Sequence, residues 1–437
     1  MRTITTLFHR RALIVFVGLA ACCQALPGVD PAVPDFSAYE KTYPWAPSDA
    51  FLAETSIMQS SSNLYEAKAG NPVLPDMFTL ADGTKVTTAE VWAARRRPEL
   101  LALFASEVYG VSPPRPDTLQ FHVVAEDPRA MDGRATLRQV KISFGLGGET
   151  FGFHLNLFVP NQRTGRVPVF LLLNHRPPRN TDPTRAYKSD FWPAEYAIAR
   201  GYAIAAINVA AEVDPDQRNA TTGLRQFYRA HHPRSETLTW ATLAAWAWSA
   251  SRAVDYFETD PAIDPARIAV IGHSRGGKTA LWAAAQDTRF ALVCYNGAGE
   301  GGSSLARRNF GETLAAINKN YPHWFTTKYA TYGGNVEALP VDTHELLALI
   351  APRGCHDGEA TIDVHADPRG SWLALREASR VWQLYGLAPR QLAREMPLVH
   401  ELFLNGPIAY HMHEGLHDLT AYDWKMYFDH ADILFRQ

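Results

Sequence analysis

The chain has 437 residues, of which 46% are hydrophobic and 20% charged, and this balance excludes a disordered chain. Its formal net charge is −3 at pH 7, so nothing in its electrostatics favours nucleic acid or an anionic membrane surface as a partner. We expect no nucleic-acid partner, and the length suits one large domain or two ordinary ones.

The first 25 residues are predicted to be an export signal. Three arginines precede an apolar run over residues 12–21, which is too short to span a bilayer and gives way to small residues. Leu19-Ala20-Ala21-Cys22 resembles a bacterial lipobox, which predicts a lipid anchor on Cys22; the alternative is ordinary cleavage near Ala25. We therefore expect an exported protein that is periplasmic, anchored in the outer membrane or secreted.

The rest of the chain divides into an arm and one globular domain. Residues 26–73 are rich in Pro, Ala and Ser and are predicted to form an N-terminal arm or linker, which leaves residues 74–437 for the domain. Within the domain, residues 74–116 look mainly helical, and the arginines at positions 95–97 predict a solvated helix face. Residues 119–160 alternate in the manner of antiparallel strands.

Continuous apolar runs then replace the alternating pattern. They cover residues 167–174, 202–209, 268–272 and 291–296, as expected of strands that are buried on both faces. An amphipathic helix is predicted over residues 240–257. Strands that alternate with helices indicate a largely parallel sheet with helices on both faces.

Cys294 and Cys355 are the cysteines of the globular part. In an oxidising compartment they either pair with each other or remain buried free thiols. No cysteine cluster points to a structural zinc site. We expect neither a metal nor another cofactor.

The strongest chemical signal is Gly272-His273-Ser274-Arg275-Gly276. Such a motif arises by chance in roughly one chain of this size in seven. Here, however, a buried strand runs directly into it and a helix-forming run, residues 278–285, follows. The arrangement resembles the nucleophile turn of the α/β-hydrolases, with the amide of Arg275 facing the developing oxyanion. It predicts an α/β-hydrolase three-layer sandwich with a mostly parallel central sheet and Ser274 as nucleophile.

A serine nucleophile needs a base and an orienting carboxylate. In this fold the chain order is serine, acid, histidine, and the histidine follows the last strand. The last strand-like run is 407–413, so His417 is the predicted base, whereas His411 and His413 lie inside the run and are predicted to be structural. Asp363 is the predicted acid, chosen from a segment that also holds Asp357, Glu359 and Asp367, and Glu300 is the main alternative.

His413-Glu414-Gly415-Leu416-His417 also matches the His-Glu-x-x-His pattern of zinc proteases. That pattern binds zinc only on a helix, where two histidines four residues apart share one face. Here Gly415 disfavours a helix, the upstream residues look like a strand and no clear third ligand follows. The metalloprotease hypothesis is therefore the weaker one.

Longer stretches resemble one family, the glucuronoyl esterases of carbohydrate esterase family 15, in their bacterial form. The resemblance extends from about residue 74 to the C-terminus. The stretches that carry it are Arg96–Leu100, Glu107–Gly110, Arg200–Ala203, Ala244–Trp248, Ser251–Tyr256, Glu258–Pro261 and, as the most specific, Gly272–Trp282.

The resemblance implies roles for individual residues. Ser274 resembles the nucleophile, His417 the base and Arg275 the arginine of the oxyanion site. Lys278 resembles the lysine that contacts uronic-acid hydroxyls, with a helix-end salt bridge as the alternative. Glu312 resembles a further sugar-contacting carboxylate and is equally well interpreted as a helix cap.

Two departures from the family pattern stand out. Many members carry the catalytic glutamate after the strand that follows the nucleophile helix, where this chain has Gly297. Some bacterial members instead have an acid two residues before a tryptophan; this chain keeps Asp363 but has His365 in place of the tryptophan, and Trp372 is too distant to replace it. These departures favour Asp363 as the acid and put the sugar platform in question.

The family implies hydrolysis of the ester between 4-O-methyl-glucuronic acid of xylan and lignin alcohols. Our main hypothesis is that reaction, through an acyl-enzyme on Ser274 and in a monomeric protein. The alternatives are an acetyl xylan esterase or other carboxylesterase of the same fold, and a non-catalytic glycan-binding relative.

Overall fold

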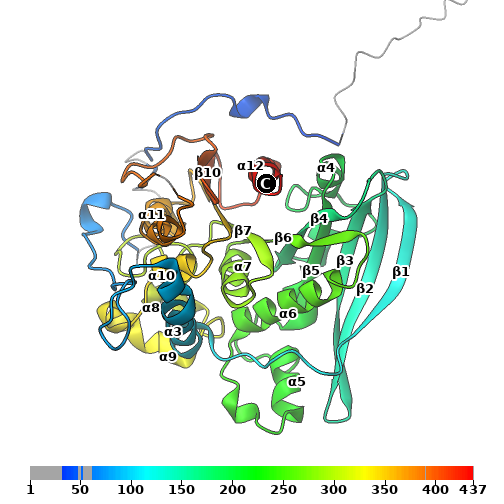
Figure 1. Cartoon of the computed structure of the whole chain (residues 1–437), viewed down its shortest axis with the longest axis horizontal. Helices are drawn as coiled ribbons and strands as arrows, with labels where there is room; N and C mark the ends of the chain where they lie inside the picture. Colours follow the sequence, from blue (N-terminus) through cyan, green and yellow to red (C-terminus); the bar gives the residue numbers. More distant parts are fainter. Residues whose placement is uncertain (1–31, 48–50, 53–61, 389, 437) are drawn as a thin grey trace, which may run out of the picture.

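The computed structural model describes residues 32–47, 51–52, 62–388 and 390–436, and its central feature is one ten-stranded sheet (Figure 1). The spatial order of the strands is β1-β2-β3-β5-β4-β6-β7-β8-β10-β9. Their bounds are β1 Gln120–Ala130, β2 Ala135–Leu146, β3 Glu149–Pro160, β4 Val167–Asn174, β5 Ala203–Asn208, β6 Ile263–His273, β7 Phe290–Asn296, β8 Gly354–Ala360, β9 Phe403–Asn405 and β10 Ile408–His413.

The sheet is parallel at its centre and antiparallel at both edges. Strands β5, β4, β6, β7, β8 and β10 pair in parallel, whereas β1, β2, β3 and β5 pair antiparallel, as do β10 and β9. The antiparallel strands over residues 119–160 and the buried parallel strands expected from the apolar runs are both present.

Helices cover both faces of this sheet (Figure 1), which is the predicted three-layer arrangement. Helices α6 and α7 pack on one face, and α4 and α12 on the other. The helix bounds are α2 Ala89–Val91, α3 Arg97–Phe104, α4 Ala194–Ala199, α5 Leu224–His231, α6 Thr242–Phe257, α7 Arg275–Gln286, α8 Leu314–Asn320, α9 Thr327–Ala330, α10 Thr343–Ala348, α11 Pro368–Leu384 and α12 Ala421–Leu434.

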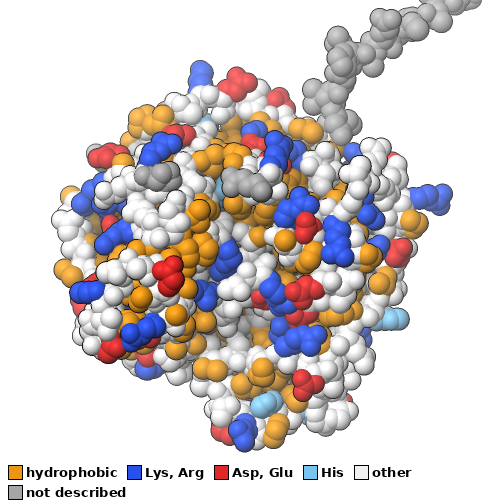
Figure 2. Space-filling view, in the orientation of Figure 1, with side chains coloured by type: hydrophobic (Ala, Val, Ile, Leu, Met, Phe, Trp, Pro, Cys, Tyr) orange, Lys and Arg blue, Asp and Glu red, His pale blue; other side chains and the backbone are white. Residues whose placement is uncertain are grey.

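The surface carries charges of both signs. On the face in Figure 2, Lys and Arg side chains are interspersed with Asp and Glu side chains and do not gather in one area. Within the described part of the chain, no helix is both long enough and apolar enough to cross a membrane.

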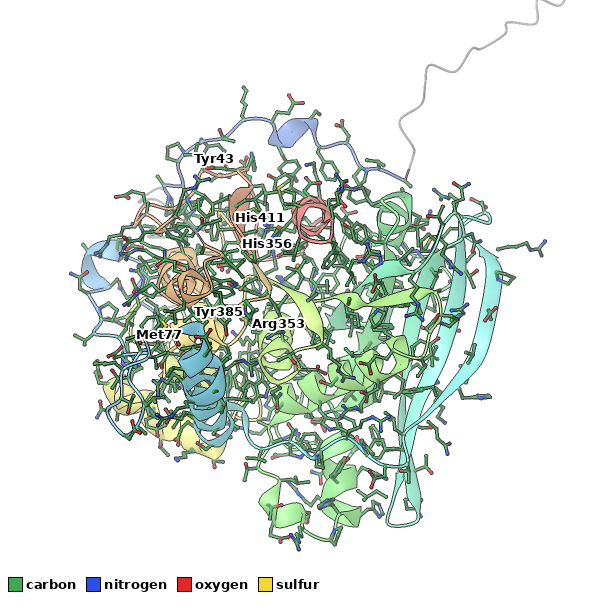
Figure 3. The ribbon with its side chains drawn as sticks, in the orientation of Figure 1. Tyr43, Met77, Arg353, His356, Tyr385 and His411 are labelled. Atoms are coloured by element: carbon green, nitrogen blue, oxygen red, sulfur yellow. The ribbon has the colours of Figure 1, made fainter. Side chains whose placement is uncertain are left out.

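The described part of the arm packs against the domain. Tyr43, labelled in Figure 3, forms a β-bridge with Val399, and its carbonyl accepts a hydrogen bond from the Val399 amide at 2.8 Å. The Trp45 indole donates to the carbonyl of Thr361 at 3.0 Å, two residues before Asp363. The export signal, the lipobox and Cys22 lie outside the described residues.

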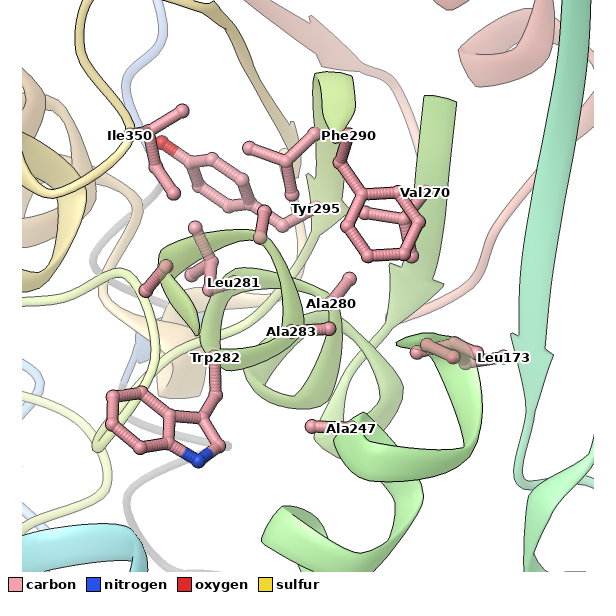
Figure 4. Packing of buried hydrophobic residues seen from close by; sticks show 14 of the residues in the cluster. Leu173, Ala247, Val270, Ala280, Leu281, Trp282, Ala283, Phe290, Tyr295 and Ile350 are labelled. Atoms are coloured by element: carbon pink, nitrogen blue, oxygen red, sulfur yellow. The ribbon is translucent and has the colours of Figure 1, made fainter. Parts of the chain in front are cut away.

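Successive side chains of the central strands point to opposite faces of the sheet and pack into two separate hydrophobic clusters. On β4, Leu171 and Leu173 face α6 and α7, whereas Phe170 and Leu172 face α4 and α12. Figure 4 shows the first cluster, where Leu173 and Val270 of the sheet pack near alanines of α6 and α7. Trp282 lies at the outer side of α7 and stacks on Tyr109 with ring centroids 4.6 Å apart. This packing holds α7, which begins directly after Ser274, against the sheet.

The same alternation decides the state of the two cysteines. Cys294 on β7 and Cys355 on β8 are buried free thiols. Val293, not Cys294, pairs in register with Cys355, so the two thiols lie on opposite faces of the sheet. The disulfide alternative is therefore wrong.

The segment before the sheet departs from expectation in two respects. Its helical part spans residues 89–109, with π-helical turns over Trp92–Arg96 and Ala105–Tyr109, and the rest lacks helix. Of the arginines at positions 95–97, Arg95 is exposed as expected, whereas Arg96 is buried against Glu345 at 3.1 Å. Arg97 donates to the carbonyls of Ala285 and Leu349.

Candidate active site

Ser274 occupies a sharp turn between the end of β6 and the start of α7. Its φ and ψ are 56° and −127°, a strained conformation for a residue with a side chain. The turn is tight enough to exclude side chains beside it: a Cβ on Gly272 would lie 1.9 Å from the carbonyl oxygen of Gly276, and a Cβ on Gly276 would lie 2.9 Å from that of Leu173. The two glycines of the motif are therefore required by the backbone path.

His417 and Asp363 form a hydrogen-bonded pair in which the His417 Nδ1 donates to Asp363 Oδ2. Asp363 is nearly buried, whereas the imidazole is 42% exposed. Since Nδ1 faces the carboxylate, Nε2 is the nitrogen left to face a serine hydroxyl. The pair has the orientation that a Ser-His-Asp triad requires.

The segments that carry this acid and this base follow neighbouring parallel strands. His413, which ends β10, is in register with Ala360, which ends β8. Three hydrogen bonds then join the two segments: the Thr361 amide donates to the His413 carbonyl, the Ile362 amide to the Gly415 carbonyl, and the Gly415 amide to Thr361 Oγ1, at 3.0, 2.9 and 3.1 Å. The register of the sheet thereby brings Asp363 to His417.

The other candidate carboxylates have different partners. Glu300 accepts a hydrogen bond from the Tyr329 hydroxyl at 2.6 Å, and burial raises its pKa to about 8. Asp357 and Glu359 lie inside β8 and are fully buried. Asp367 pairs with Arg308 at 2.9 Å. Glu300, the main alternative acid, is therefore not the carboxylate that contacts His417.

Gly297 lies against the acid–base pair. Its φ is +50°, and a Cβ there would lie 3.0 Å from Asp363 Oδ2 and 3.1 Å from His417 Nδ1. A glutamate at this position would compete with Asp363 for the same space beside His417. The glycine and the aspartate thus form one consistent arrangement.

These residues border a pocket of about 330 Å³, within the range of ligand sites. It brings together the predicted residues Ser274, Arg275, Lys278, Glu312, Asp363 and His417, together with His365. Asn320, Tyr321 and Trp324 also line it, and sequence reasoning missed all three. Glu300 is not among the lining residues.

Lys278 is buried one helical turn after Ser274. Its ammonium donates to the carbonyls of Ala298 and Glu300. Burial lowers its pKa, and the nearby carboxylates Glu312 and Glu300 oppose that shift. The partners of the ammonium are carbonyls rather than a carboxylate, so the salt-bridge alternative is wrong. An ammonium has three donors, and one remains for the pocket.

Glu312 lies just before helix α8 and is not its cap. Thr313 is the capping residue, and its hydroxyl accepts from the Ala316 amide at 3.3 Å. Glu312 Oε1 is instead 4.0 Å from Nε2 of His365, and burial lowers the pKa of this histidine. The helix-cap alternative is therefore wrong, and Glu312 and His365 together present polar atoms to the pocket.

The side chain of Arg275 is held by Asp216 and Trp324. Its guanidinium donates to Asp216 at 2.6 Å and lies 4.4 Å above the ring of Trp324. The Trp324 indole donates to the same Asp216 at 2.6 Å, and its ring stacks on Tyr321 at 3.9 Å. In the sequence, the aromatic residues that follow α8 are the one indication of this part of the pocket. Nothing near them in the sequence indicates Asp216.

Comparisons with known proteins agree on one family. A family model described as glucuronyl esterase of fungi matches residues 142–386. Carbohydrate esterase MZ0003, from an unknown prokaryotic organism, is 38% identical over 401 residues, which cover 85% of this chain and 91% of that protein. The chain belongs to the glucuronoyl esterases of carbohydrate esterase family 15. The resemblance seen in the motifs is thereby confirmed.

One further relative and two solved structures agree with this family. A 4-O-methyl-glucuronoyl methylesterase of Schizophyllum commune is 28% identical over 334 residues, covering 72% of this chain and 75% of that protein. The solved glucuronoyl esterase of Solibacter usitatus superposes with a TM-score of 0.77 at 34% identity, covering 85% of this chain and 100% of that one. A structure described as a promiscuous esterase of this family, from a marine bacterial metagenome, has a TM-score of 0.77 at 37% identity, covering 85% of this chain and 99% of that one. The α/β-hydrolase fold and the class of carboxylic ester hydrolase are confirmed.

The zinc-protease pattern does not have the geometry that its chemistry needs. His413 ends a strand and His417 lies in the following loop, so the two rings do not share a helix face. His413 is committed to Asp423 at 2.8 Å. In the described ranges, no group of three or more His, Cys, Asp or Glu side chains has an arrangement that could hold a metal ion.

Proposed function

We propose that this esterase cleaves the ester between the (4-O-methyl-)glucuronic acid of xylan and a lignin alcohol, through an acyl-enzyme on Ser274. Family membership supports hydrolysis of 4-O-methyl-glucuronoyl esters. The observation that carries the residue assignment is the hydrogen bond from His417 to Asp363, in a pocket that Ser274 also lines. We propose no metal or other cofactor for the reaction.

The proposed reaction has two acyl transfers. His417 Nε2 removes the proton of Ser274 Oγ as that oxygen attacks the uronate carbonyl, and Asp363 stabilises the imidazolium. The amide of Arg275, in the first turn of α7, faces the oxyanion, aided by the positive end of the helix. The C–O bond to the alcohol breaks and His417 protonates the leaving oxygen. Water then attacks the acyl-enzyme by the same route and releases the free acid and Ser274.

The polar side chains that line the pocket can bind the hydroxyls of glucuronic acid. Lys278 has one ammonium donor left beyond its two carbonyl partners, and Glu312 offers acceptor oxygens. A donor and an acceptor facing one pocket can bind neighbouring sugar hydroxyls. His365 adds a third polar group at the position where some bacterial members of the family carry tryptophan.

A second candidate is a broader esterase that also accepts acetylated xylan or simple esters. It is favoured by the 37% identity to a relative described as promiscuous. The two are separated by kcat/KM for benzyl glucuronate, methyl 4-O-methyl-glucuronate and acetylated xylan. Glucuronoyl specificity predicts the highest value for the uronate esters.

Ser274→Ala is the direct test of the nucleophile. Turnover of benzyl glucuronate should fall by about 10⁶-fold, because the attacking oxygen is absent, while the far-ultraviolet circular dichroism stays unchanged. Wild-type turnover in this variant would refute the assignment, and a wild-type protein without activity on any uronate ester would refute the substrate class.

We also propose an exported monomer that carries a lipid on Cys22. The sequence of the first 25 residues supports export. Mass spectrometry of the mature N-terminus separates a lipidated Cys22 from cleavage near Ala25, and light scattering of the purified protein gives its oligomeric state.

A further inference from the structure

A group of fully buried histidines and one carboxylate lies beneath the loop that carries His417. Figure 3 shows His356 and His411 side by side, and His356 Nε2 lies 3.0 Å from His411 Nδ1. The other ring nitrogen of His411 donates to Asp423 on α12 at 2.8 Å. His413, at the end of β10, donates to the same oxygen of Asp423 at 2.8 Å. The proposed triad uses none of these four residues.

The hydrogen bonds of His413 fix its protonation state. Nδ1 faces the Asp423 carboxylate, and Nε2 lies 3.3 Å from the carbonyl of Leu416. Carboxylate and carbonyl oxygens only accept, so both ring nitrogens of His413 must donate. A ring that donates from both nitrogens is an imidazolium.

Asp423 is built to remain ionised beside it. One of its oxygens accepts from His411 and His413, and the other accepts from the amide and hydroxyl of Thr420. Burial alone would raise the pKa of Asp423, but the charge of His413 and the hydrogen bonds from His411 and His413 lower it. Burial would likewise lower the pKa of His413, but Asp423, the Leu416 carbonyl and the charge of Asp418 raise it.

His411 and His356 add no charge to the cluster. Burial lowers the pKa of both rings, which favours their neutral forms. In a neutral His411 that donates from Nε2 to Asp423, Nδ1 accepts from His356 Nε2. The cluster therefore contains one cation, His413, and one anion, Asp423.

The loop above this pair makes few apolar contacts. Residues 414 and 416–418 are exposed, and the Leu416 side chain is 69% exposed, so apolar packing does not fix the loop. Polar contacts fix its path. They are the hydrogen bonds to Thr361 and Ile362, the Asp418–Arg176 ion pair at 2.7 Å, the His417–Asp363 bond and the bond from His413 to the Leu416 carbonyl. That carbonyl belongs to the peptide unit that leads directly into His417.

We propose that His413 is a positioning residue: its imidazolium, paired with Asp423, holds the Leu416 carbonyl and thereby sets the place of His417 relative to Ser274. The inference rests on the proposed role of His417 as base. It also explains the His-x-x-x-His spacing, because the first histidine supports the loop and the second performs the proton transfer.

The protonation state is tested on the wild-type protein. Nitrogen-15 spectra of histidine-labelled enzyme should show both ring nitrogens of His413 protonated at mildly alkaline pH. His430, which is buried with no hydrogen-bond partner for either nitrogen and whose pKa burial lowers to about 4, should be neutral under the same conditions. A neutral His413 in this spectrum overturns the proposal, and the measurement needs no variant that has to fold.

The positioning role is tested with His413→Gln, which removes the charge and reaches at most one of the two acceptors. The expected result is a fall of about 10²-fold in kcat with KM nearly unchanged, because a small displacement of His417 impairs proton transfer more than binding. Labelling of Ser274 by a fluorophosphonate should slow by a similar factor. His430→Gln is the matched control, since it changes a neighbouring buried histidine that makes no bond to the loop, and it should keep wild-type rates.

The outcomes separate this inference from the proposed function. A folded His413→Gln protein with kcat and labelling rate within about twofold of wild type overturns the positioning role. If the wild type cleaves no uronate ester but labels at Ser274 in a His413-dependent manner, the substrate proposal fails and the positioning role stands.

Discussion

Replacing Asp363 by asparagine removes a charge from the acid–base pair while keeping its shape. In the proposed reaction His417 becomes an imidazolium in each transition state, and the Asp363 carboxylate that accepts its Nδ1–H stabilises that cation. Two unit charges about 4 Å apart at an effective dielectric constant of about 20 attract by about 4 kcal/mol. That energy corresponds to about 10³-fold in rate.

The solvent exposure of His417 lowers this expected loss of rate. The His417 ring is 42% exposed, so solvent screens part of the attraction, and the loss from charge alone in Asp363→Asn is at most about 10³-fold. The loss should appear in kcat and not in KM, because the cation exists only in the transition state. Asp363→Ala should lose more, since it also releases the orientation of the ring.

The assay is steady-state hydrolysis of benzyl glucuronate with Glu300→Gln as the matched control. Glu300 has a buried carboxyl group that contacts Tyr329 and not His417, so its replacement should leave kcat within about twofold of wild type. Wild-type kcat in Asp363→Asn, or a thousandfold loss in Glu300→Gln, would refute the assignment of the acid.

The remaining predictions concern the surroundings of this pair. The pKa of Glu300 is raised from 4.5 to about 8, so the folded state binds its proton more tightly, and the stability this gives is complete below pH 4.5 and lost as pH rises towards 8. Denaturant unfolding at several pH values should therefore show a flatter profile for Glu300→Gln than for wild type. Lys278→Met should lower kcat/KM on uronate esters and destabilise the fold by about 1–3 kcal/mol, because the carbonyls of Ala298 and Glu300 lose their donor; an unchanged melting temperature would contradict this. Gly297→Ala should reduce stability by about 1–2 kcal/mol because its φ is +50°, and should lower kcat because the new methyl group meets Asp363 and His417 at 3.0 and 3.1 Å. Unaltered kinetics in that variant would show that the pair tolerates displacement.

The nucleophile turn was predictable because all of its determinants are adjacent in the chain. A buried strand, two glycines that the backbone path requires, and a helix follow one another over residues 268–286. His417 could be predicted for a related reason, because the catalytic histidine of this fold follows the last parallel strand. The buried strands β4, β5, β6 and β7 were likewise evident as apolar runs.

Interactions across the sheet were not predictable in this way. Asp357, Glu359, Asp363 and Asp367 lie within eleven residues, and the sequence favoured Asp363 through the resemblance to bacterial family members, with Glu300 left open. The register between β8 and β10 makes the choice, because it sets the end of β8 beside the end of β10 and brings only Asp363 to His417. The β7–β8 register likewise places Cys294 and Cys355 on opposite faces, and the packing of the segment after β5 brings Asp216 to Arg275.

By itself, then, the sequence determined the features that depend on neighbours along the chain: the apolar strands, the glycine-framed Ser274 turn, the placement of His417 and the family motifs. Only the tertiary structure decided which carboxylate His417 contacts, that Lys278 binds carbonyls, and that His413 shares Asp423 with His411. The physical reason is that these contacts join residues 10 to 59 positions apart through strand register and helix docking, which local patterns do not encode.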